Sequence, residues 1–171
     1  CSFSCIVRSH LAANHAGLPL VICSEITTSD GAKLVLLATD RASYGNLAQL
    51  ITRGRRNAVK GSYALSRDDV ATFADGLLAL WVPPGKVGSD STFHAGPPPV
   101  DAFDEKSSLT LLSEKSSLTL LSGAHWVAAT FPGRAWIAVE LFAHAGDRAR
   151  LAHCAALARQ TGLPQVAAGD V

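Results

Sequence analysis

The tripeptide Gly-Leu-Pro occurs twice, and each copy joins an alanine-rich stretch to an apolar run. The first copy begins at Gly17 and leads into residues 20–26, and the second begins at Gly162 and leads into residues 165–171. Glycine can take the left-handed conformation that ends a helix, and a Leu-Pro pair resists a further helical turn. Each copy therefore predicts a helix, a sharp end and a buried strand, which is the repeating unit of an α/β fold.

The rest of the chain alternates in the same way. Asp40 and Ser66 are good N-caps, and Asp69 completes a weak capping box with Ser66. We expect helices over residues 6–16, after Asp40, after Ser66, through Trp126 towards Phe131, and over 147–161, and strands over 19–26, 33–39, 77–82, 134–142 and from 165. Strands that alternate with helices predict a mostly parallel sheet, either open or curled into a barrel.

Three acidic residues fall near the ends of expected strands, namely Glu25, Glu140 and Asp170. In parallel α/β folds the functional groups lie at the C-terminal ends of the strands, so Glu25 and Asp170 should share one edge of the sheet. Carboxylate oxygens are hard ligands that suit divalent cations. Glu140 lies inside an apolar run, where a buried carboxylate must be paired or bound to metal. The alternative, that Glu25 and Asp170 are helix caps or solvated acids, stays open.

Arg53, Arg55 and Arg56 form a basic cluster at the end of the helix that follows Asp40, and Lys60 extends it. Such a cluster can bind a phosphate group or DNA. The alternative is a solvated helix end, where cations are favoured by the helix dipole.

Residues 85–123 read as an insertion or irregular linker within a single partial domain that spans residues 1–171. Residues 85–104 are rich in Gly, Pro and Ser, and residues 105–122 are two identical copies of a nine-residue unit. Two such units are too few for a solenoid, which indicates a local duplication.

Composition limits the functional classes. The formal net charge of +1 argues against a protein that binds nucleic acid through its overall charge. The cysteines lack the spacing of zinc sites, and Cys23 and Cys154 lie in apolar segments like ordinary core residues, which favours a reducing cytoplasmic location.

No apolar run is long enough to span a membrane. No motif for a catalytic nucleophile is present, so we expect no catalytic residues in this chain. The missing initiator Met and the end at Val171 suggest a fragment.

Five runs resemble one known family. They are Leu-Pro-Leu-Val-Ile-x-Ser-Glu at 18–25, Leu-Val-Leu-Leu-Ala-Thr-Asp-Arg-Ala-Ser-Tyr-Gly-Asn-Leu-x-x-Leu-Ile-Thr-Arg-Gly-Arg-Arg at 34–56, Gly-Leu-Leu-Ala-Leu-Trp at 76–81, Phe-Pro-Gly-Arg-Ala-Trp-Ile-Ala-Val-Glu-Leu at 131–141, and Val-Ala-Ala-Gly-Asp-Val at 166–171. The chain resembles the N-terminal polymerase-and-histidinol-phosphatase (PHP) domain of bacterial error-prone DNA polymerases, C-family relatives of the DNA polymerase III alpha subunit. The resemblance covers most of residues 1–82 and 131–171.

The resemblance implies a distorted βα barrel, incomplete at both ends, whose strand ends form a cleft for Zn, Mn or Mg. By position Glu25 matches the family's metal-ligand Glu, Asp170 matches the Asp of a Gly-Asp-Val-His segment, and Glu140 matches an acid of an Ala-Val-Glu-Leu strand. The family's His-x-His segment and closing His fall outside residues 1–171, and Cys23 stands where relatives usually have Gly. An incomplete ligand set should bind metal weakly or not at all.

The implied parent protein is a DNA-directed DNA polymerase that copies damaged DNA during induced mutagenesis and repair. Within it this domain would be a scaffold or a vestigial metal-dependent phosphoesterase, and the small number of ligands favours the scaffold. The implied partners are the remainder of the polymerase chain and, through it, DNA and other mutagenesis proteins, with no membrane. The alternatives are a stand-alone metal-dependent phosphatase and a non-enzymatic interaction domain of the same superfamily.

Overall fold

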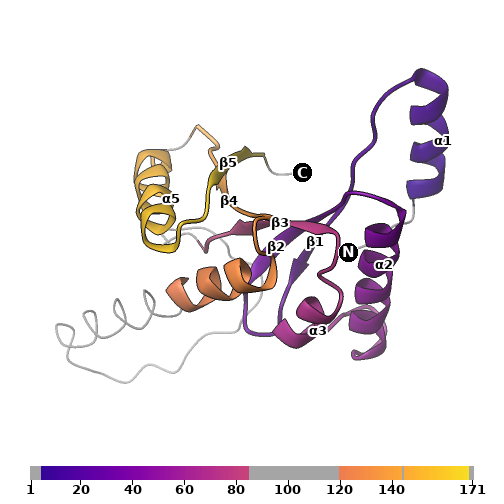
Figure 1. Ribbon diagram of the computed structural model, residues 1–171, viewed down its shortest axis with the longest axis horizontal. Helices are drawn as coiled ribbons and strands as arrows, with labels where there is room; N and C mark the ends of the chain where they lie inside the picture. The colour runs from indigo at the N-terminus through magenta and orange to yellow at the C-terminus, as the bar shows by residue number, and fades with distance from the viewer. Residues whose placement is uncertain (1–4, 85–119, 144, 170–171) are drawn as a thin grey trace, which may run out of the picture.

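A computed structural model of the chain describes residues 5–84, 120–143 and 145–169 (Figure 1). Its elements in chain order are α1 (Ile6–Ala16), β1 (Ile22–Thr27), β2 (Lys33–Ala38), α2 (Arg41–Arg56), α3 (Arg67–Thr72), β3 (Leu77–Val82), a helix over residues 120–130, β4 (Ala135–Glu140), α5 (Asp147–Thr161) and β5 (Gln165–Ala168). The predicted alternation of helices and strands is confirmed, and the fold belongs to the α/β class.

The five strands form one mixed sheet in the order β1-β2-β3-β4-β5. β2 is antiparallel to both β1 and β3, whereas β3, β4 and β5 are parallel to one another. Residues 28–32 alone connect β1 to β2, and so short a link permits only an antiparallel pair. The links that follow β3 and β4 contain helices, as parallel neighbours require.

This topology corrects part of the sequence prediction. The expected parallel arrangement holds for β3 to β5 but is wrong at β2, which runs against both of its neighbours. The described strands form an open sheet with β1 and β5 at its edges, so the PHP-type barrel stays a prediction.

Local sequence signals explain where the helices begin and end. The Asp40 side chain accepts from the Ser43 amide at 2.7 Å, and the Ser43 hydroxyl accepts from the Asp40 amide at 2.9 Å. Ser66 and Asp69 make the same reciprocal pair at the start of α3, as predicted. Gly17 and Gly162 end α1 and α5 with φ of 65° and 74°, so both Gly-Leu-Pro copies stop a helix as predicted.

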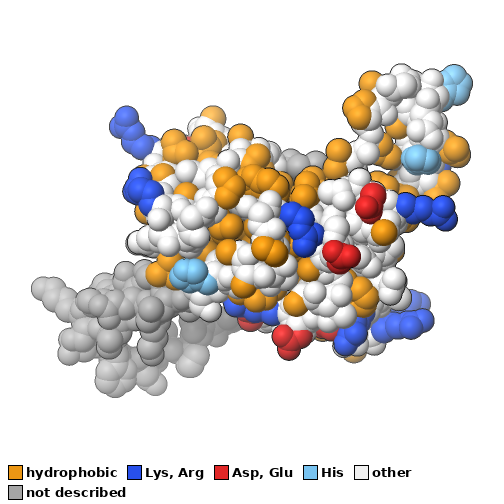
Figure 2. Space-filling view, viewed as in Figure 1, with side chains coloured by type: hydrophobic (Ala, Val, Ile, Leu, Met, Phe, Trp, Pro, Cys, Tyr) orange, Lys and Arg blue, Asp and Glu red, His pale blue; other side chains and the backbone are white. Residues whose placement is uncertain are grey.

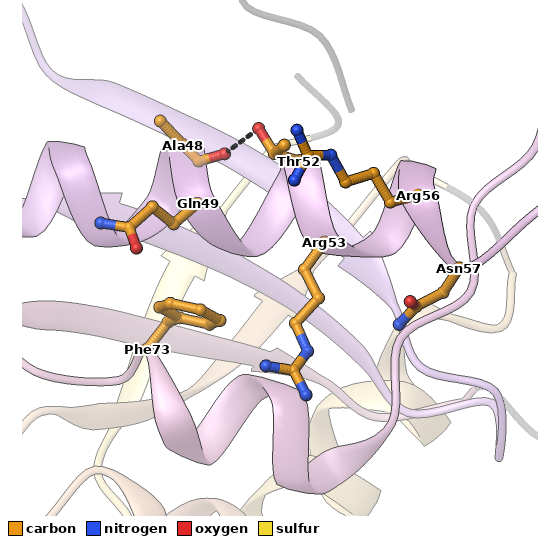
Figure 3. A pocket seen from close by; sticks show the side chains of 7 residues that line it. All are labelled: Ala48, Gln49, Thr52, Arg53, Arg56, Asn57 and Phe73. Carbon is orange, nitrogen blue, oxygen red and sulfur yellow. Dashed lines mark hydrogen bonds between the residues drawn. The ribbon is translucent and has the colours of Figure 1, made fainter.

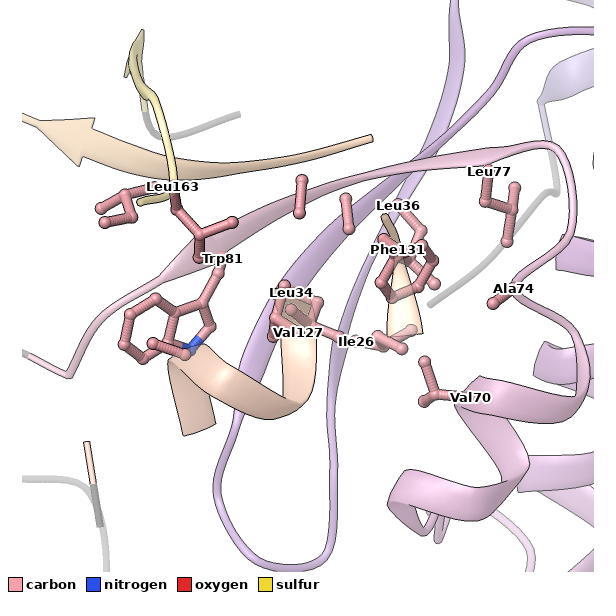
Figure 4. Packing of buried hydrophobic residues seen from close by; sticks show 14 of the residues in the cluster. Ile26, Leu34, Leu36, Val70, Ala74, Leu77, Trp81, Val127, Phe131 and Leu163 are labelled. Carbon is pink, nitrogen blue, oxygen red and sulfur yellow. The ribbon is translucent and has the colours of Figure 1, made fainter. Parts of the chain in front are cut away.

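The hydrophobic core lies on one face of the sheet (Figure 4). Alternate residues of the strands point into it, and α2, α3, the helix over 120–130 and α5 contribute the residues that pack against them. In one row across the sheet, Ile26, Leu34, Trp81 and Ile137 are paired in register, and each is at most 1% exposed. The described helices that form the core therefore lie on one face of the sheet.

α1 projects from this body (Figure 1) and contains no buried residue. Cys154 of α5 is buried in the core, as predicted. The expectation that Cys23 is a core residue is wrong, because Cys23 is exposed on the face of β1 that points away from the core.

The predicted insertion over residues 85–123, with its repeat at 105–122, lies mostly outside the described residues. Its last four residues, 120–123, belong to the helix over 120–130. No helix in the described ranges is both long enough and apolar enough to cross a membrane.

Candidate functional site

Glu25, the first predicted metal ligand, is paired with a lysine. The Nζ atom of Lys33 on β2 lies 3.0 Å from Oε2 of Glu25, and the two side chains are 37% and 48% exposed. Lys33 pairs in register with Thr27, two residues beyond Glu25, so the ion pair runs diagonally across the β1–β2 hairpin. The structure thus gives Glu25 a cationic partner on the neighbouring strand.

Glu140, the second predicted ligand, ends β4 and is buried. The Nη2 atom of Arg150, in the first turns of α5, donates to its Oε2 at 3.3 Å. The sequence argument that a carboxylate at this position must be paired or metal-bound is satisfied by pairing. Cys154 lies one helical turn beyond Arg150, and burial raises the pKa of its thiol, which keeps it an inert core residue.

The described acids are not gathered into a metal site. Glu25 and Glu140 lie on strands separated by β2 and β3, so three strand spacings of about 4.8 Å separate them along the sheet. Among the described residues no three His, Cys, Asp or Glu side chains come together closely enough to hold a metal ion. Asp170 lies outside the described residues, so its predicted role as a third ligand stays a prediction. Glu25 and Glu140 alone do not fit a Zn, Mn or Mg site.

The basic cluster at the end of α2 is divided by the structure. Arg53 and Arg56 line a groove between α2 and α3, whereas Arg55 is not part of its lining. We call this the α2–α3 groove (Figure 3); it has a volume of about 540 Å³ and is lined by Ala48, Gln49, Thr52, Arg53, Arg56, Asn57 and Phe73. The predicted phosphate or DNA contact of the three arginines stays a prediction, but two of them now share one concave surface with an aromatic ring.

Asp69 fixes the position of Arg53 in this groove. Its Oδ1 lies 2.6 Å from Nε of Arg53, and its Oδ2 accepts from the amide of Ser66 at 2.9 Å and from the hydroxyl at 2.8 Å. The hydrogen bond from the Ser66 backbone is the main cause that lowers the pKa of Asp69, with the charge of Arg53 adding to it. Asp69 therefore stays ionised and joins the start of α3 to the end of α2.

A second arginine ties together segments that are far apart in the sequence, and the sequence analysis missed it. Nε of Arg67 on α3 donates to Oδ2 of Asp30 in the β1–β2 turn at 2.6 Å. Its guanidinium carbon also lies 4.9 Å from the ring centroid of Trp126, in the helix over 120–130. No local sequence pattern predicts these contacts, because Arg67 is 37 positions from Asp30 and 59 positions from Trp126. They follow from the tertiary fold.

The face of the sheet opposite the core was also missed. Register places Val35, Leu37, Leu78 and Leu80 on it, and all four are half-buried, with no described helix across them. We call this the open sheet face. Figure 2 shows hydrophobic side chains gathered on the molecular surface over the region of β3 to β5. The continuous Leu and Val of β2 and β3 are the signal for it, since strands buried on both faces lose the alternation of polar and apolar residues.

Comparison with known proteins finds similarity to polymerases along the whole chain. It is 40% identical over 176 residues to the error-prone DNA polymerase of Dechloromonas aromatica, 41% over 172 residues to that of Methylococcus capsulatus, and 40% over 171 residues to that of Pseudomonas aeruginosa. The chain is homologous to the N-terminal region of bacterial error-prone DNA polymerases. The resemblance to these enzymes inferred from the sequence is confirmed. No protein-family model matches the chain.

Each of these matches covers the whole of this chain but only 13% or 14% of the polymerase. The chain therefore spans only a small part of the length of each of these relatives.

Proposed function

We propose that this chain is the PHP-type N-terminal module of a cytoplasmic error-prone DNA polymerase and that it acts as a scaffold for the polymerase core. The open sheet face is the observation that carries the proposal. Val35 and Leu37 of β2 and Leu78 and Leu80 of β3 are half-buried on a face that no described helix covers, and apolar side chains in such a position are usually covered by further chain. In the polymerase, chain outside residues 1–171 covers this face.

A barrel is the arrangement that such a sheet fits. In βα barrels the helices form an outer ring, and the inner faces of the strands pack against one another in the centre. Among the described residues the helices that form the core lie on one face, and the opposite face carries large apolar side chains, which supports a partial barrel whose inner face meets further strands. Polymerase chemistry itself and the contacts with DNA and other mutagenesis proteins belong to the full-length protein.

The pairing of the acids supports the scaffold over a metal-dependent phosphoesterase. Lys33 compensates the charge of Glu25, and Arg150 compensates that of Glu140, so neither carboxylate needs a metal ion for charge balance. Multi-metal hydrolases instead hold their ions about 4 Å apart with converging carboxylates.

Calorimetric titration of the purified chain with manganese and zinc tests this choice. The variants are Glu25→Ala, Glu140→Ala and Asp170→Ala, with Asp68→Ala on the exposed surface of α3 as the matched control. We expect no stoichiometric binding that depends on the three acids, because at least two of them have cationic partners. One-to-one binding that disappears in the three variants and persists in Asp68→Ala would contradict the scaffold and support the phosphoesterase.

A further inference from the structure

We propose that the α2–α3 groove binds the backbone of single-stranded DNA. This contact lies on the helical exterior of the domain, away from the strand-end acids. The inference rests on the proposed function for the identity of the nucleic acid, since a polymerase handles single-stranded template. The groove is shallow and open to solvent rather than an enclosed ligand pocket.

The two arginines of the groove have donors that no described residue uses. Arg53 uses its Nε for Asp69, which leaves its terminal nitrogens for an incoming oxygen. Arg56 has no ion pair or hydrogen bond with any residue in the described ranges, and its side chain is exposed. Figure 3 shows the Arg53 guanidinium reaching towards α3, whereas the Arg56 side chain runs back along α2 in the direction of Thr52. Planar guanidinium groups match the geometry of phosphate oxygens.

Phe73 supplies the aromatic surface that a base needs. Its ring is half-buried against the core and faces the groove opposite Gln49 and Arg53 (Figure 3). Stacking on an aromatic ring is worth about 1–3 kcal/mol per base and does not depend on base identity. The Gln49 and Asn57 side chains add donors and acceptors at the two ends of the lining.

The same surface fits a nucleic acid better than an acidic peptide. Arginines beside an aromatic ring are the usual combination in proteins that bind single strands without sequence preference. A carboxylate peptide needs the arginines but gains little from the ring. Asp69, the carboxylate that pairs with Arg53, is 11% exposed and is not part of the groove lining, so it repels an incoming phosphate only weakly.

Fluorescence anisotropy of a labelled oligo(dT) of about 20 nucleotides with the whole chain, at about 50 mM salt, tests the proposal. We expect Arg56→Ala and Phe73→Leu each to weaken binding about tenfold. Arg55→Ala is the matched control, because it removes the same charge one position away but outside the groove lining, and it should weaken binding less than threefold. Arg56→Ala should also reduce the slope of log K against log salt by about 0.7.

Three results would overturn the proposal. The first is no binding at low salt in a chain that melts cooperatively. The second is an equal loss in Arg55→Ala and Arg56→Ala, which would mean that charge alone attracts the DNA. The third is displacement of the oligonucleotide by polyglutamate at equal charge concentration, which would assign the groove to acidic proteins. None of these results tests the proposed scaffold role, which is inferred from the open sheet face and not from the α2–α3 groove.

Discussion

Replacing Trp81 with alanine should lower the free energy of unfolding by about 3–5 kcal/mol. Trp81 is the largest fully buried side chain, 1% exposed, and it lies in β3 between Leu34 and Ile137 at the centre of the core. Its removal leaves a cavity that the surrounding strands and helices cannot fill. Urea unfolding followed by circular dichroism measures the loss.

Trp136→Ala is the matched control for this substitution. Trp136 is also a strand tryptophan, in the neighbouring β4, but it lies on the opposite face of the sheet and is half-buried. We expect it to cost about 2 kcal/mol in the isolated chain, less than Trp81→Ala, because part of the Trp136 side chain stays exposed to solvent and contributes no transfer energy. Equal losses for the two tryptophans would show that the core does not lie on the face where the structure places it.

Replacing Gly76 with alanine should cost about 2–4 kcal/mol, through two separate effects. Gly76 has φ of 69°, which L-residues avoid, and a Cβ added there would lie 2.9 Å from the Cβ of buried Ser43. The surrounding turn cannot shift easily, because Thr39 donates to the Gly76 carbonyl at 2.8 Å and Arg134 donates to those of Ala74 and Leu77.

Gly133→Ala separates the two effects. Gly133 also has φ of 69°, but a Cβ added there meets no atom within 4 Å. It should therefore cost only the backbone strain, about 1–2 kcal/mol. The excess in Gly76→Ala, read from the same unfolding curves, measures the contact with Ser43. If the two variants were equally stable, the close approach of the β3 turn to α2 would be wrong.

Local chemistry was enough to predict most helix and strand positions. Asp40, Ser66 and the two Gly-Leu-Pro copies fix where helices begin and end, because capping and left-handed glycine act within a few residues. The first strand begins later than predicted, at Ile22 rather than Pro19. Proline has no N–H to donate to the sheet, so the residues beside it are poorly suited to pairing.

Strand direction and the exposure of single residues were harder to predict, because they depend on which face of the sheet becomes covered. An apolar run such as that of β2 reads the same whether the strand is parallel or antiparallel. Cys23 was placed in the core on its apolar neighbours alone, yet alternation in β1 turns it outwards while Ser24 and Ile26 turn inwards.

For the candidate sites, too, the residue types were predictable from the sequence and their contacts were not. The acids and arginines were recognisable as chemical groups, but their partners come from other segments: Lys33 for Glu25, Arg150 for Glu140 and Asp69 for Arg53. Phe73 joins Arg53 and Arg56 only because α3 packs beside α2. Spacing along the chain does not encode such contacts, so the division of the basic cluster could not be predicted.

The most direct test of the central claim is primer extension by a chimera. This chain would replace its matching stretch in the error-prone DNA polymerase of Dechloromonas aromatica, with Leu80→Ser on the open sheet face and Leu151→Ser on the exposed side of α5 as the control. We predict that the chimera and the Leu151→Ser control extend primers, whereas Leu80→Ser loses at least tenfold activity while costing the isolated chain less than about 1.5 kcal/mol. Two results would contradict the claim that this face braces the polymerase: a chimera that does not extend primers, or a chimera whose primer-extension activity is unchanged by Leu80→Ser.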